Sequence, residues 1–229
     1  MRREIRDIIT TDKIEDEIIL GERSVEIDTK VQAAEVREIT KAIKSVMREK
    51  NLKSLSAPAI GYQRRIFCLD YSDLEIKTYI NPVIGDAKGL ELSIETCSSI
   101  PGKRFMRPRN NDITVVYQTP TGKIETRRLI GLAAIVFQHE MDHIDGLLLK
   151  DVGIEVPDDY EEWSDEDKQE FAEDYLDSLD LLRKTVQEEI DRDDDLKKIQ
   201  DAEKFMTGVY KGEIEIAPIK EIDASELPK

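Results

Sequence analysis

Two histidines, the only ones in this 229-residue chain, stand four residues apart in the run Gln138-His139-Glu140-Met141-Asp142-His143. On an α-helix, positions i and i+4 lie one above the other on the same face, so both imidazoles can reach one metal ion. Glu140 lies beside them, which completes the HExxH pattern of two metal-binding histidines and a proton-transferring glutamate. The alternative is an ordinary helix with a surface charge, but polar residues ending so apolar a helix need a reason, which a metal ion supplies. We predict a helix over about residues 130–145, followed by Gly146 as C-cap.

A metal site needs a third protein ligand, and Cys97 is the best candidate. It lies in the polar, turn-prone segment Glu95–Gly102, whereas Cys68 lies in the apolar run RIFCLDY and is interpreted as a core residue. One soft thiolate and two imidazoles suit Fe(II), Zn, Co or Ni and do not suit Mg or Ca.

The charge distribution divides the chain near residue 151. Residues 151–229 hold 27 of the 50 acidic side chains but only 10 of the 34 basic ones. We therefore predict a metal-binding domain over residues 1–151 and an acidic, mainly helical C-terminal extension over residues 152–229. Such an acidic surface repels phosphate backbones, so no nucleic acid is expected there. It is a solvated surface, or it meets a basic protein partner.

Local patterns predict the following elements: a helix over 33–50, a loop over 54–61, strands over 65–71 and 77–83, a hairpin of 112–118 with 123–129, a long amphipathic helix from 171 to 190, a helical piece over 196–206 and a strand within 209–222. The apolar stripe of the long helix packs on its own domain, or it binds a partner or a second copy of the chain.

Compartment and membrane association are constrained by what the sequence lacks. No apolar run approaches the roughly 18 residues of a membrane span, and the N-terminus has no apolar signal region, so neither a membrane location nor secretion is expected. Two cysteines are too few for a disulfide framework, which favours a reducing compartment such as the cytoplasm.

Three motifs of the chain resemble those of the peptide deformylases: QHEMDHIDG, ETCSSIPG and SLSAPAIG, over about residues 2–151. These enzymes are metal-dependent hydrolases that remove the N-formyl group from nascent polypeptides. The resemblance implies an α+β fold in which antiparallel sheets surround a central HExxH helix. It also implies one divalent ion, Fe(II) in the cell and Zn or Ni after isolation, with Cys97, His139 and His143 as ligands and Glu140 as the acid/base.

The first motif departs from the family pattern G-x-G-L-A-A-P-Q, because Leu52–Ala59 has lost both glycines and the final Gln. That Gln donates a hydrogen bond to the developing oxyanion, which Ala59 cannot do, although the backbone N–H of Ser98 remains as a donor. The resemblance assigns substrate contacts to Arg104, Leu55 and Thr96.

Two functions therefore stay open. One is hydrolysis of N-formyl-methionyl peptides, an early step of N-terminal methionine processing, with reduced or shifted activity. The other is a deformylase-like assembly or partner-binding protein that retains the metal as a structural element. An HExxH metalloprotease is a weaker third reading, because the Cys ligand and the flanking motifs argue against it.

Overall fold

The computed structural model describes residues 7–71, 75–185 and 187. Two compact units divide the chain, one ending at Ser164 and the other beginning at Asp165. The composition boundary at residue 151 stays a prediction. In chain order the elements of the first unit are α1 (Ile14–Leu20), α2 (Ala33–Glu49), β1 (Ser54–Ser56), η1 (Pro58–Ile60), β2 (Ile66–Leu69), β3 (Lys77–Cys97), β4 (Ile100–Gln118), β5 (Ile124–Ile130), α3 (Leu132–Asp145), α4 (Leu149–Val152), β6 (Ile154–Glu155) and η2 (Tyr160–Glu162).

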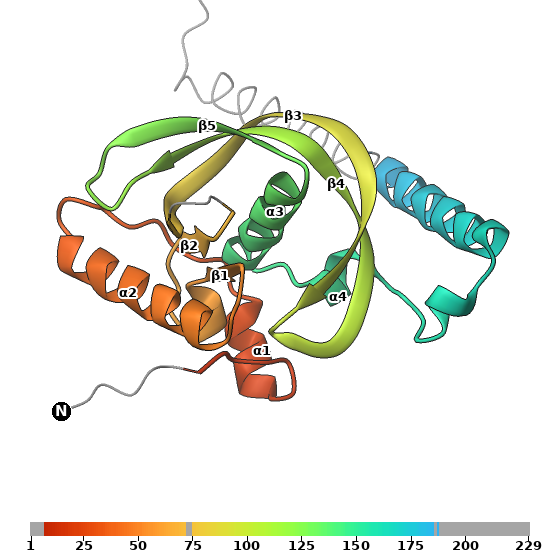
Figure 1. The fold of residues 1–229 in the computed structure, drawn as a ribbon, viewed down its shortest axis with the longest axis horizontal. Helices are drawn as coiled ribbons and strands as arrows, with labels where there is room; N and C mark the ends of the chain where they lie inside the picture. Colours follow the sequence, from red (N-terminus) through yellow and green to blue (C-terminus); the bar gives the residue numbers. More distant parts are fainter. Residues whose placement is uncertain (1–6, 72–74, 186, 188–229) are drawn as a thin grey trace, which may run out of the picture. The chain divides into compact units, whose positions relative to one another are not determined.

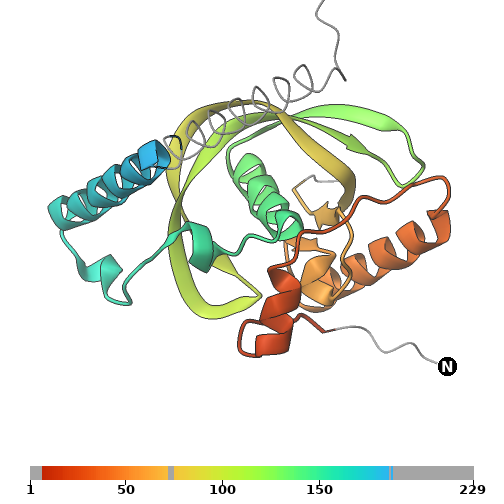
Figure 2. The ribbon, with the colours of Figure 1, turned by 180° about the vertical axis from the view of Figure 1, so that it is seen from behind.

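An antiparallel sheet surrounds α3 in the first unit. Its strand order is β1-β2-β3-β4-β5, and β6 pairs with β4 beside this path. The long hairpin of β3 and β4 curls around α3 in Figure 1, and the view from behind in Figure 2 shows the same enclosure. The predicted α+β class, with antiparallel strands around a central HExxH helix, is confirmed.

Two apolar layers hold the sheet in place. The helix predicted over residues 33–50 is α2, and its buried apolar stripe packs against β1, β2 and η1. On the other face of the sheet, the Phe137 ring of α3 lies edge-on to Phe67 and Tyr79, with ring centroids 4.9 and 5.2 Å apart. Because apolar side chains are buried on both faces of the sheet, the position of α3 against the sheet is fixed.

Three local expectations were wrong. Residues 54–56 form a strand and 58–60 a 3₁₀ turn instead of a loop, because β1 pairs with β2. The strand predicted over 77–83 does not end there but continues to Cys97, since a register shift between Ile80 and Val83, with Asn81 at φ 46°, lets pairing with β4 resume. Strand β4 likewise begins at Ile100, not at residue 112. Pairing between strands overrides the weak local pattern in each case.

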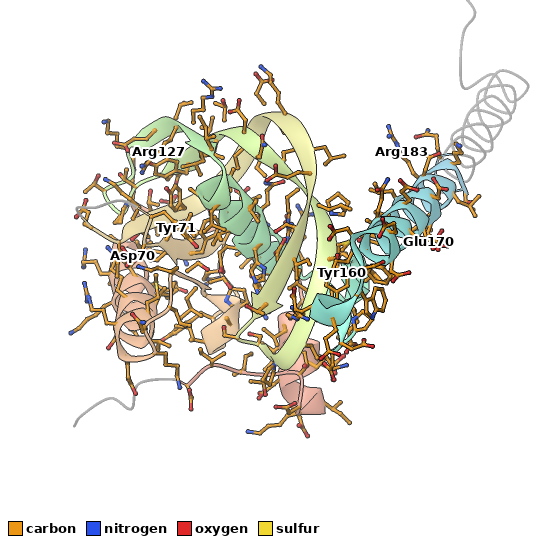
Figure 3. The ribbon with its side chains drawn as sticks, turned by 45° about the vertical axis from the view of Figure 1, so that its right-hand side comes forward. Asp70, Tyr71, Arg127, Tyr160, Glu170 and Arg183 are labelled. Carbon is orange, nitrogen blue, oxygen red and sulfur yellow. The ribbon has the colours of Figure 1, made fainter. Side chains whose placement is uncertain are left out.

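The second unit contains a helix over residues 165–185, on which Figure 3 labels Glu170 and Arg183. The predicted amphipathic helix is therefore present as far as the chain is described. Leu181 and Leu182 are exposed on it. The helical piece predicted over 196–206 and the strand predicted within 209–222 lie outside the described residues. Within the described part of the chain, no helix has the length and apolar character needed to cross a bilayer.

Candidate metal centre

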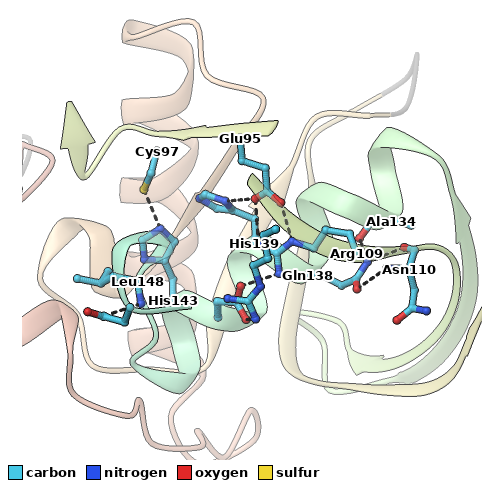
Figure 4. Close-up of polar contacts among 12 residues, drawn as sticks. Glu95, Cys97, Arg109, Asn110, Ala134, Gln138, His139, His143 and Leu148 are labelled. Atoms are coloured by element: carbon cyan, nitrogen blue, oxygen red, sulfur yellow. Dashed lines mark hydrogen bonds and ion pairs between the residues drawn. The ribbon is translucent and has the colours of Figure 1, made fainter. Parts of the chain in front are cut away.

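Helix α3 presents His139 and His143 one turn apart, with ring centroids at 5.1 Å. The helix ends at Gly146, whose φ of 75° and amide bonds to the last carbonyls form the expected C-cap. A Cβ atom at this position would lie 2.6 Å from the carbonyl oxygen of Gly21, so both backbone conformation and packing require glycine. Two-way hydrogen bonds between the Gln138 amide and the Asn110 backbone, at 2.7 and 3.0 Å, fix α3 against β4 (Figure 4).

Cys97 closes the group of potential ligands. It is the last residue of β3, and its Sγ lies 3.1 Å from Nε2 of His143 (Figure 4). The ligand atoms of Cys97, His139 and His143 all lie within 4.8 Å of one another. The structure thus brings together the three residues proposed as ligands, from a strand and a helix that are distant in sequence, whereas Cys68 is buried in the core beside Thr78.

The electrostatics of these groups fit a bound cation. Burial works to raise the pKa of the Cys97 thiol, but the two imidazoles outweigh it and hold this pKa well below its usual value. Burial works to lower the pKa of His139, but hydrogen bonds to Cys97 and Glu95 raise it to about 10. Cys97 therefore favours its thiolate form, and the histidines beside it favour their protonated, positively charged form. A divalent ion of borderline softness supplies that charge and would release the protons.

Glu95 holds the first histidine in place. Its Oε2 lies 2.8 Å from Nδ1 of His139, and its two oxygens accept hydrogen bonds of 2.6 and 2.9 Å from Arg109. With Nδ1 engaged by Glu95, Nε2 is the ring nitrogen of His139 left for a metal ion. Burial raises the pKa of Glu95, but the His139 and Arg109 contacts dominate and lower it to about 2.

The network continues to Asp142, whose Oδ2 accepts a 2.6 Å hydrogen bond from Arg109. Only 2% of the Arg109 side chain is exposed, so these are buried ion pairs. The roles of Glu95 and Asp142 were not predicted from the sequence. Strand alternation could have pointed to Glu95, because residues 95 and 97 of one strand lie on the same face. That inference would have required predicting that β3 extends as far as Cys97.

Glu140 is 3% exposed, and its Oε2 has no hydrogen-bond partner among the described residues. A buried carboxylate oxygen without a partner is costly in a folded protein and is a common mark of a reactive site.

The other predicted residues lie outside this cluster of ligand atoms. Leu55 is in the apolar layer under α2, and Ser98 is exposed in the turn between β3 and β4. Thr96 is exposed and pairs across the hairpin with Arg104, whose Nη1 lies 2.5 Å from Oε1 of Glu161. The roles of Ser98, Leu55, Thr96 and Arg104 stay predictions.

Comparisons with known proteins place the chain in a family. The family model described as polypeptide deformylase matches residues 6–155. The peptide deformylase of Dictyoglomus thermophilum is 36% identical over 133 residues, which cover 55% of this chain and 86% of the relative. That of Thermomicrobium roseum is 34% identical over 156 residues, covering 64% and 85%.

Solved structures agree. The peptide deformylase of Thermotoga maritima superposes with a TM-score of 0.57 at 28% identity, covering 68% of this chain and all of the other. That of Synechococcus elongatus, in complex with actinonin, gives 0.57 at 26%, covering 65% and 79%. The chain belongs to the peptide deformylase family, a family of metal-binding hydrolases.

Proposed function

We propose that this protein hydrolyses the amide bond between the formyl group and the methionine of N-formyl-methionyl peptides. The observation that carries the proposal is the convergence of Cys97, His139 and His143 next to Glu140, a buried carboxylate whose Oε2 accepts no hydrogen bond from the described residues. A purely structural metal site has no use for that carboxylate, whereas a hydrolase needs a base next to its metal ion.

Cys97 Sγ and the two imidazoles would hold one divalent ion, with Fe(II) as the cellular metal and Zn or Ni as substitutes. When bound, such an ion acidifies water and polarises a carbonyl group. Glu95 would keep the His139 ring oriented and electron-rich for that task.

Glu140 is the proposed acid/base. It accepts a proton from the attacking water while the water oxygen bonds to the formyl carbon, and it passes that proton to the leaving amine as the C–N bond breaks. Formate and a free methionyl N-terminus result. The backbone N–H of Ser98, in the turn after Cys97, is the proposed donor to the developing oxyanion.

Ala59 supports a reduced or shifted activity. The residue is buried in the apolar layer, and its methyl side chain carries no hydrogen-bond donor. Loss of one oxyanion donor typically costs about 10² to 10³ in rate. Arg104, Leu55 and Thr96 are the proposed substrate contacts, and the cytoplasm is the proposed compartment, because Cys97 must stay reduced.

An assembly or partner-binding role without catalysis is the alternative. It is favoured by the altered first motif and by the acidic second unit, whose described helix could engage a partner or another copy of the chain.

Formate release from formyl-Met-Ala-Ser separates the two functions. The test uses protein purified anaerobically with Fe(II) or loaded with Ni, beside a Glu140→Gln variant of equal metal content. The proposal expects release by the wild type and a loss of at least about 10²-fold in the variant. Equal rates in both would contradict it and leave the alternative.

A further inference from the structure

Ser56, in the first motif, carries a buried hydroxyl group without a hydrogen-bond partner. The residue is the last of β1 and is fully buried, and its Oγ has no partner among the described residues. A buried hydroxyl without a partner costs folding free energy, so it needs an explanation. The family pattern has alanine at this position and glutamine at that of Ala59. The chain has therefore gained a hydroxyl three residues before the place where it has lost an amide.

The Ser56 side chain points toward α3. Ser56 pairs directly with Phe67 of β2, and residues paired in this way lie on the same face of a sheet. The Phe67 ring packs edge-on against Phe137 of α3, whereas Leu55, the residue before Ser56, belongs to the layer under α2. Strand alternation therefore directs the Ser56 hydroxyl to the face that α3 covers.

The contacts of β2 show which part of α3 lies level with this serine. Just before β2, Nη1 of Arg65 donates a hydrogen bond of 3.2 Å to the carbonyl oxygen of Ile144, near the end of the helix. At the other end of β2, Leu69 lines the same small cavity as Ala133, near the start of the helix. Strand and helix thus run in opposite directions. The serine, which pairs with the middle of β2, lies level with the middle of α3, at about residues 137–140.

Glu140 lies on the side of α3 that faces β1. Gln138 and Asp142 both bond to β4, and in helical projection they lie about 100° and 140° to one side of Phe137. Glu140 lies about 60° to the other side of Phe137, which itself packs on β2 and β3. Because the strand order is β1-β2-β3-β4, Glu140 points toward β1, which α3 contacts (Figure 1).

Two buried oxygens without partners, Oγ of Ser56 and Oε2 of Glu140, therefore lie between β1 and the middle of α3. We propose that Ser56 is a positioning residue for Glu140. Its hydroxyl donates a hydrogen bond toward the carboxylate through one shared water molecule, since the two oxygens do not bond directly in the structure. This bond restrains the carboxylate for proton transfer. The role in proton transfer rests on the proposed function, whereas the coupling of the two side chains rests on the structure alone.

A double-mutant cycle of Ser56→Ala and Glu140→Ala, followed by urea unfolding of the metal-free full-length chain, tests the coupling. We expect Ser56→Ala to raise the unfolding equilibrium constant about 5-fold when Glu140 is present, because a hydrogen bond toward a charged group is lost. In the Glu140→Ala background the same change should lower the constant or leave it unchanged, because the hydroxyl then has no partner. If Ser56→Ala does not destabilise the chain that contains Glu140, the proposal is overturned.

Thr40→Val is the matched control. Thr40 of α2 also carries a buried hydroxyl oxygen without a partner among the described residues, but α2 packs on the other face of the sheet from α3. Its effect on the unfolding constant should be the same with and without Glu140. Ser56→Ala should fold, because alanine is smaller than serine and is the residue of the family pattern at this position.

The rate of formate release from formyl-Met-Ala-Ser measures the positioning role. Ser56→Ala should lower kcat about 10-fold and leave KM within about 2-fold, because Ser56 acts on the base and not on the bound peptide. Thr40→Val should change neither constant. Equal kcat values of wild type and Ser56→Ala would contradict the positioning role.

The two readouts separate this inference from the proposed function. Coupling between Ser56 and Glu140 in the unfolding cycle, without formate release by the wild type, would support the pair and contradict the proposed function. Formate release by the wild type without such coupling would do the reverse.

Discussion

The Glu95 carboxylate lies 2.8 Å from Nδ1 of His139, across 44 residues of sequence and between a strand and a helix. This contact connects the geometry of the sheet to the orientation of an imidazole. Because the same carboxylate is clamped by Arg109, the His139 ring is held by a rigid, buried partner.

Glu95→Gln should weaken metal binding about 10- to 100-fold, since the amide is a poorer acceptor for the His139 ring N–H and leaves the imidazole less basic. Competition for zinc with a chromogenic chelator measures the affinity. Glu91→Gln, an exposed change on the same strand, is the control and should leave it unchanged. Equal affinities of the two variants would show that Glu95 does not support the site.

Arg109→Met should destabilise the fold by about 3–5 kcal/mol, because it leaves two buried carboxylates, Glu95 and Asp142, without their shared partner. Urea unfolding of metal-free protein measures the change. Arg128→Met breaks an exposed pair with Asp112 and should cost about 1 kcal/mol or less. If Arg109→Met lowers the free energy of unfolding as little as the control does, the ion pairs of Arg109 do not stabilise the fold as proposed.

Stability should fall in acid through Glu95. Its pKa in the folded chain is about 2, below the ordinary value of 4.5, so its contribution is complete above pH 4.5 and is lost as the pH falls toward 2. Urea unfolding midpoints of metal-free protein between pH 6 and pH 2.5 should decline less steeply in Glu95→Gln than in wild type. Parallel declines would mean that the Glu95 pKa is not lowered by folding.

Cys68 should be inert in the native protein. Burial raises the pKa of its thiol to about 11, so only about one molecule in a thousand carries the thiolate at pH 8. A Cys97→Ser variant should release no colour from Ellman's reagent until it is unfolded in urea, and should then titrate one thiol. Rapid reaction of the native variant would place Cys68 at an accessible site.

Helix α3 was the part of the fold best predicted from the sequence, because His139 and His143 carry a strict helical spacing and Gly146 marks its end. Cys97 was distinguished from Cys68 by its polar neighbours. Strand β1 was missed because Ser54 and Ser56 give no apolar alternation, and their strand exists only through pairing with β2. Glu95 was missed for the same reason, since its role depends on the register of a strand that extends 14 residues beyond the predicted end at residue 83.

X-ray absorption of the zinc-loaded protein tests whether Cys97, His139 and His143 bind one metal ion. We expect one sulfur ligand at about 2.3 Å and two imidazole nitrogens at about 2.0 Å, with the sulfur lost in Cys97→Ala and kept in Cys68→Ala. A zinc shell without sulfur in the wild type, or a sulfur that survives Cys97→Ala, would contradict it.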